Sequence, residues 1–97
     1  MFEYECVSKA VKVYCANPYW RTYYEGAPSE ACRERIALSF FYGIYNSAVT
    51  PEEYVPERER LERKLKLEDW VYLERFAGNN PWRGLCRKKI RELGGAI

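Results

Sequence analysis

The 97-residue chain contains no histidine. Histidine has the side-chain pKa nearest neutrality, and it is the commonest general base and metal ligand in proteins. Its absence excludes Ser-His and Cys-His catalytic arrangements and any metal site built on imidazole. The chain also lacks a glycine-rich phosphate-binding loop. We therefore expect a protein that binds a partner, and we expect no enzymatic activity, cofactor, metal or small-molecule substrate.

Sequence signals for membranes and for secretion are also missing. No apolar run approaches the roughly 20 residues of a transmembrane helix, so we expect no membrane partner. Residues 1–5 lack the basic and apolar regions of a secretory signal. This absence favours a cytoplasmic location.

The cysteines show no metal-binding or redox spacing. Cys6, Cys15, Cys32 and Cys86 are scattered, and no two of them form a C-x-x-C pair. Without a secretory signal, we expect reduced thiols that are buried in the core. Two disulfides, or a zinc site that uses all four thiols, are the alternatives.

The composition is rich in apolar and aromatic side chains, whereas the net charge is small. Hydrophobic residues make up 47% of the chain and aromatic residues 16%, which predicts one small domain, residues 1–97, with a packed core. The net charge of +2 gives only weak attraction to polyanions. However, residues 81–97 contain five basic side chains and one acidic, a local charge of +4.

Signals for helix starts and stops recur along the chain. The predicted starts are Asn17-Pro18, Ser29, the capping box Thr50-Pro51-Glu52-Glu53, and Asn80-Pro81. The predicted stops are Gly26, Gly78 and Gly94. These signals, with few alternating stretches, predict an all-α fold.

We expect a compact bundle of about five helices around a central buried helix. The predicted helices span residues 2–16, 18–25, 29–47 and 81–93, and residues 51–77 are also predicted to be helical, with a start at Pro51 or at Pro56. The central helix is 29–47, because residues 36–45 are apolar on nearly every side. Two alternatives stay open: residues 2–15 can form strands, and residues 51–77 can break near 67–69, with Asp69 as a cap. In the last helix we expect Trp82, Leu85, Cys86, Ile90 and Leu93 to face inward.

Two segments carry candidate binding residues. The first is an aromatic box around an arginine, whose members are Tyr19, Trp20, Arg21, Tyr23 and Tyr24. Such rings can anchor a protein partner or stack on bases, or they can simply cover the helix 29–47. Four rings cannot all face one way on a short helix, so we expect at least one to be exposed.

The second is a basic ridge on the last helix, formed by Arg83, Arg87, Lys88 and Arg91. Arginines four residues apart share one helix face and can contact phosphates; the alternative is a solvated helix face. Residues 69–77 and 81–93 also have the loop length of a helix-turn-helix. The match is poor, because Glu74 stands where a small residue is expected.

The run from 57 to 66 alternates in charge. We expect the pairs Glu59 with Arg63 and Glu62 with Lys66 on a charged surface helix; a helix that docks on a partner is the alternative. Cys86 is the only cysteine with basic neighbours, but its inward position argues against a nucleophile.

The sequence resembles no family that we can identify from its motifs. We predict a small non-enzymatic binding protein that docks on a protein or a nucleoprotein complex. By analogy with small phage and mobile-element proteins that block host machinery, it would be an inhibitor or accessory factor. Its target would be host nucleic-acid-handling or defence machinery. The alternative is direct binding of DNA or RNA through the helix 81–93.

Overall fold

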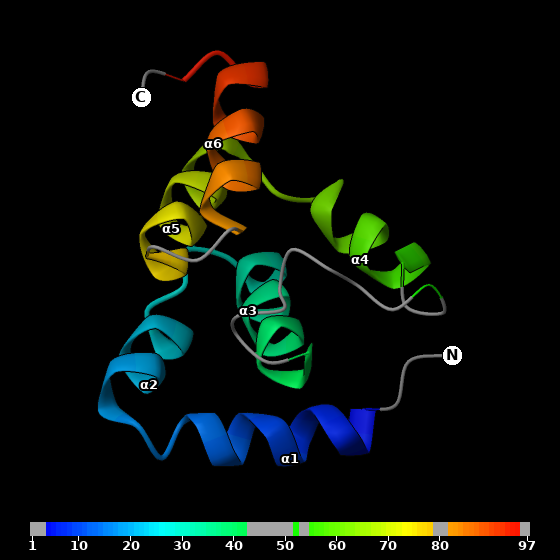
Figure 1. Cartoon of the computed structure of the whole chain (residues 1–97), viewed down its shortest axis with the longest axis vertical. Helices are drawn as coiled ribbons and strands as arrows, with labels where there is room; N and C mark the ends of the chain where they lie inside the picture. Colours follow the sequence, from blue (N-terminus) through cyan, green and yellow to red (C-terminus); the bar gives the residue numbers. More distant parts are fainter. Residues whose placement is uncertain (1–3, 43–51, 53–54, 79–81, 96–97) are drawn as a thin grey trace.

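The computed structural model describes residues 4–42, 52, 55–78 and 82–95 (Figure 1). In this part of the chain the regular elements are six α-helices and no strand. Their bounds are α1 (Tyr4–Tyr14), α2 (Pro18–Glu25), α3 (Glu30–Tyr42), α4 (Val55–Glu62), α5 (Leu67–Ala77) and α6 (Trp82–Glu92). The all-α prediction is therefore confirmed, and the strand alternative for residues 2–15 is wrong over residues 4–14. The described helices number six instead of five because the segment 51–77 is divided.

Helix α3 lies at the centre, in contact with α1, α2, α4 and α5 (Figure 1). Residues 35–40 are all buried, so every face of this part of the helix is covered by a neighbour. The predicted central helix is thus confirmed over residues 30–42, whereas residues 43–47 lie outside the described part of the chain. Its start also follows the prediction, since the Ser29 hydroxyl accepts a hydrogen bond from the Cys32 amide at 3.1 Å.

Helices α1 and α2 cover one side of α3. The α1 side chains Ala10, Val11 and Tyr14 pack against the core. The Asn17 side chain caps α2 by accepting from the Tyr19 amide at 2.9 Å. The other predicted caps, Thr50 with Glu53 and Asn80 with Pro81, lie outside the described residues.

A single carboxylate joins the starts of α3 and α5. Asp69 is the third residue of α5, and its Oδ2 accepts from the Lys66 backbone amide at 2.8 Å. Its Oδ1 accepts from the Ser29 hydroxyl at 2.9 Å. Asp69 is only 1% exposed, so both bonds are sheltered from water. The predicted break near 67–69 is therefore confirmed, although Asp69 acts from inside the helix and not from the position before it.

Replacement of Asp69 with alanine should lower the free energy of unfolding by about 1–2 kcal/mol, because a helix cap is lost and Ser29 loses its acceptor. Urea denaturation followed by circular dichroism measures this change. The control is Glu68→Ala at the neighbouring exposed position, which should change stability by less than about 0.5 kcal/mol. Equal effects of the two substitutions would contradict the assigned role of Asp69.

Helices α5 and α6 form an antiparallel hairpin. At one end, a Cβ placed on Gly95 would lie 2.7 Å from Leu67 Cδ1, so the start of α5 adjoins the end of α6. At the other end, the Phe76 and Trp82 rings lie 5.9 Å apart. Contacts at both ends do not fit the steep crossing of a helix-turn-helix, so that arrangement is wrong here.

The end of α6 corrects one prediction. Gly94 has φ of 84°, and the Gly95 amide donates to the Ile90 carbonyl at 2.9 Å, the pattern of a Schellman cap. The helix ends at Glu92, so Leu93 does not continue the inward stripe and is 49% exposed. Trp82, Cys86 and Ile90 are buried as expected. No helix within the described ranges has both the length and the apolar character that crossing a bilayer demands.

Candidate functional site

The aromatic box lies largely against the core. Trp20 is half-buried, with its ring centroid 5.1 Å from that of Tyr14. Tyr23 packs on Phe76 at 5.5 Å, and Tyr24 packs on Phe40 at 6.1 Å. Three of the four rings therefore bury much of their surface in contacts with the rest of the protein.

Two members of the box remain at the surface. Tyr19 is 50% exposed, which confirms the expectation that at least one ring is accessible. Arg21 is exposed as well, and its Nε donates to the Cys15 carbonyl at 3.1 Å. Tyr19 and Arg21 are thus the exposed members of the box, and the other three rings are partly buried.

The basic ridge is held in place by an acidic residue of α5. Arg83 Nε and Arg87 Nε both donate to Glu74 Oε1, at 2.7 Å and 3.2 Å. The hydrogen bond from Arg83, with a further contribution from Arg87, lowers the pKa of Glu74, so this carboxylate is ionised at neutral pH. Two positive charges share one negative charge, which leaves about +1. Sequence reasoning treated Glu74 only as a mismatch to a motif and missed this role.

The rest of the ridge faces outward from α6. Arg91 and Lys88 are exposed, and Lys88 lines a groove of about 520 Å³ between α4 and α6. The groove is lined by Arg58, Glu59, Glu62, Arg63, Leu85, Lys88, Lys89 and Glu92. The sequence placed the ridge correctly on one helix, but it did not indicate that α4 supplies the opposite wall.

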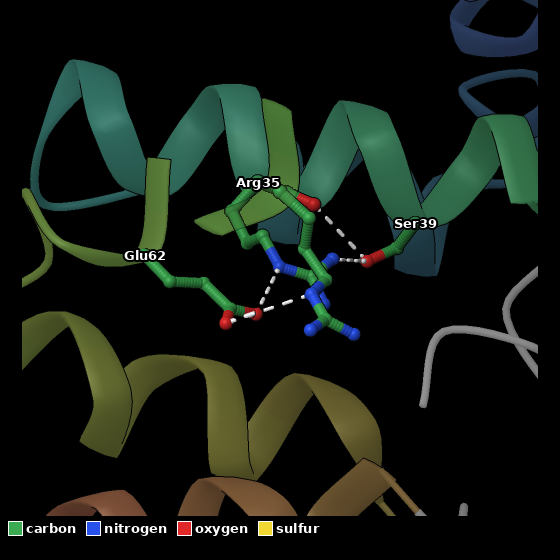
Figure 2. Close-up of polar contacts among 4 residues, drawn as sticks. Arg35, Ser39 and Glu62 are labelled. Carbon is green, nitrogen blue, oxygen red and sulfur yellow. Dashed lines mark hydrogen bonds and ion pairs between the residues drawn. The ribbon is translucent and has the colours of Figure 1, made fainter. Parts of the chain in front are cut away.

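A buried ion pair fixes that wall to the core (Figure 2). Arg35 of α3 is fully buried, and its Nε donates to Glu62 Oε2 of α4 at 3.1 Å. Its Nη1 donates to Ser39 Oγ at 3.1 Å, and its guanidinium carbon lies 4.6 Å from the centre of the Trp82 ring. Burial lowers the pKa of the Arg35 guanidinium, and Glu62 opposes that shift. Arg58 approaches the other Glu62 oxygen at 3.8 Å.

Two corrections follow for α4. Its ion pairs join Glu57 with Arg60 and Arg58 with Glu62, where the sequence predicted Glu59 with Arg63 and Glu62 with Lys66. The second predicted pair fails because α4 ends at Glu62, so Lys66 is not one helical turn away. In addition, nothing in the sequence around Arg35 marks this residue as buried.

Positive charge is concentrated on α6 and on the segment that follows α4, whereas α4 itself holds two basic and three acidic residues. Residues 55–66 hold five basic and three acidic side chains, and residues 82–92 hold five basic and one acidic. Together these segments carry ten positive and four negative charges, a sum of +6, so the rest of the chain carries −4. The asymmetry is much larger than the net charge of +2 indicates.

The thiols are unpaired in the part of the chain where side chains are described. Cys15, Cys32 and Cys86 are free, and the last two are buried. Burial raises the pKa of Cys32 and of Cys86 to about 12. Neither is therefore a thiolate near neutral pH. Over the described residues, no three Cys, Asp or Glu side chains are grouped as metal ligands would be.

Iodoacetamide at pH 8 should label Cys15 in the folded protein while Cys32 and Cys86 stay unlabelled. Cys15 is only half-buried, whereas the other two thiols are both inaccessible and protonated. Peptide mass spectrometry locates the label. In urea all three sites should react, and rapid labelling of Cys86 without denaturant would contradict the packing of α6.

Comparisons of the chain with models of protein families, with curated proteins and with solved structures find no match. The choice among functions therefore depends on the geometry and charge described above.

Proposed function

We propose that the protein is a non-enzymatic binding domain that docks through α4 and α6 on the phosphate backbone of a nucleic acid. The observation that carries this proposal is the charge of +6 on the segments that flank one groove. Lysine and arginine side chains that contact phosphates release condensed counterions, and this release drives association. Of the two functions considered from the sequence, this one uses the surface that has the most unbalanced charge.

The arginines on this side are held in position before any ligand binds. Glu74 orients Arg83 and Arg87, and Glu62 contacts both Arg35 and Arg58. Each carboxylate serves two guanidiniums, so each group keeps a residual positive charge. Ordered cations lose less side-chain entropy when they bind a phosphate, which favours affinity.

The test is fluorescence anisotropy with a labelled oligonucleotide over a range of salt concentrations. The observed affinity should fall steeply as salt rises, with a slope of about one per phosphate contact. The double variant Lys88→Glu with Arg91→Glu should weaken binding by about tenfold or more, because two exposed cations become anions. Lys12→Glu is the matched control, since Lys12 is exposed on α1, away from α6 (Figure 1). No binding at low salt would refute the proposal.

Docking on a protein, as an inhibitor or accessory factor, is the second proposal. The exposure of Tyr19, at 50%, supports it, because an accessible tyrosine is a common interface anchor. In this case Tyr19→Ala should weaken capture of a partner without changing thermal stability. Capture that survives nuclease treatment would favour this proposal, and capture that nuclease abolishes would favour nucleic acid.

A further inference from the structure

We infer that the groove between α4 and α6 takes a single nucleic-acid strand, whose backbone phosphates lie between the cations of its two walls. This inference rests on the proposed function and specifies its ligand. It concerns the form of the nucleic acid and the way it is contacted, neither of which follows from charge alone.

The cations face one another across a hollow. Arg58 and Arg63 come from the α4 side, and Lys88 and Lys89 come from α6. A positively charged groove that follows the backbone is the usual feature of proteins that bind single strands. A convex face would fit the outside of a duplex better.

Four cations and three carboxylates line the groove, and two of the carboxylates are engaged in ion pairs, whereas Glu59 is exposed. Glu62 contacts Arg35 and Arg58, and Glu92 contacts Lys89 at 3.8 Å. Arg63 and Lys88 have no ion-pair partner among the described residues. These two exposed cations, one on each wall, are therefore the first that a phosphate meets.

The side chains of α6 fall into three sets. Three of its eleven residues face the core: Trp82, Cys86 and Ile90. Arg83 and Arg87 face α5 through Glu74, and four more line the groove: Leu85, Lys88, Lys89 and Glu92. Only Gly84 and Arg91 remain outside these three sets. A recognition helix must present several side chains to the base edges, whereas the exposed cations of α6 are mostly engaged by Glu74 or line the groove.

The lining also indicates how the strand is contacted. Among the described residues, Leu85 is the only apolar one that lines the groove, where it also packs against the core, and none of the lining residues is aromatic. Single-strand proteins that hold bases do so by stacking them on rings. Contacts here would therefore reach the phosphates and leave the bases outside, so binding should be independent of sequence.

The experiment compares four ligands of equal length by anisotropy and competition at low salt: oligo(dT), the corresponding duplex, an abasic deoxyribose-phosphate oligomer, and poly-glutamate. We expect oligo(dT) to bind about tenfold more tightly than the duplex, and the abasic oligomer to bind within about threefold of oligo(dT). Poly-glutamate should compete only weakly. Competition by poly-glutamate equal to that of oligo(dT) would make the groove a general anion site and overturn the assignment.

Two charge reversals locate the ligand. Arg63→Glu, on the α4 side of the groove, should weaken oligo(dT) binding by about tenfold, and Arg91→Glu, outside the groove, by less than about threefold. Both side chains are exposed, and unchanged thermal melting confirms that the variants fold. If the duplex binds as tightly as the single strand and Arg91→Glu has the larger effect, this inference fails while the proposed function stands. If no nucleic acid binds, the proposed function itself fails.

Discussion

Replacement of Glu62 with alanine should lower the free energy of unfolding by about 3–5 kcal/mol. The substitution removes the carboxylate that pairs with the fully buried Arg35 guanidinium. Loss of one partner of a buried pair is costly because the other charge remains away from water. Small domains have free energies of unfolding of about 5–15 kcal/mol, so this change removes a large part of the total stability. Urea denaturation followed by circular dichroism measures it.

Substitution of Arg35 should lower the stability less than substitution of Glu62 does. Arg35→Met removes the buried cation, and Glu62 then keeps Arg58 as a neighbour and retains some exposure, 11% of its side chain. We therefore expect Arg35→Met to cost less than Glu62→Ala. The double variant Arg35→Met with Glu62→Leu should be more stable than Glu62→Ala alone, because no charge is left buried. A double variant less stable than either single change would contradict the assigned pairing.

Replacement of Trp82 with alanine should have the second largest effect, again about 3–5 kcal/mol. The ring is fully buried, lies edge-on to Phe76, and carries the Arg35 guanidinium over its face. The substitution therefore creates a cavity at the junction of α3, α5 and α6, and it removes a cation–π contact.

Trp20→Ala is the internal control for this measurement. Trp20 is half-buried on α2, so its removal takes less apolar area out of the core. The decrease in the free energy of unfolding should therefore be clearly smaller than for Trp82→Ala. The midpoints of urea denaturation, followed by tyrosine fluorescence or circular dichroism, rank the two variants. A Trp20→Ala protein less stable than Trp82→Ala would mean that α2, and not the α5–α6 hairpin, holds the larger part of the core.

Much of the fold could be predicted because local signals and apolar patterning agree. Asn17 and Ser29 cap helices by short-range hydrogen bonds, which depend only on neighbouring residues. The all-round apolar stretch of α3 requires burial whatever surrounds it. The end of α6 was harder to place, because Leu93 fits the helical stripe but lies after the last helical residue, Glu92, in the turn that Gly94 completes.

The candidate site was only partly predictable, because it depends on pairs that are distant in the chain. The spacing of Arg83, Arg87 and Arg91 placed them on one face, but their partner Glu74 belongs to another helix. The burial of Arg35 could not be predicted, because arginine side chains are ordinarily exposed. Its partner Glu62 lies 27 residues away, and no local pattern connects the two.

Salt should weaken the binding of a ligand at the surface, but it should have little effect on the buried Arg35–Glu62 pair. Helix α4 is short and highly charged, and Leu61 is its one buried residue, so this internal pair contributes much of its attachment. Dissolved ions screen exposed charges strongly, but they scarcely reach a sheltered pair. Rising ionic strength should therefore release a bound polyanion while the α4 wall stays in place, so that loss of affinity reports on the ligand contacts and not on unfolding.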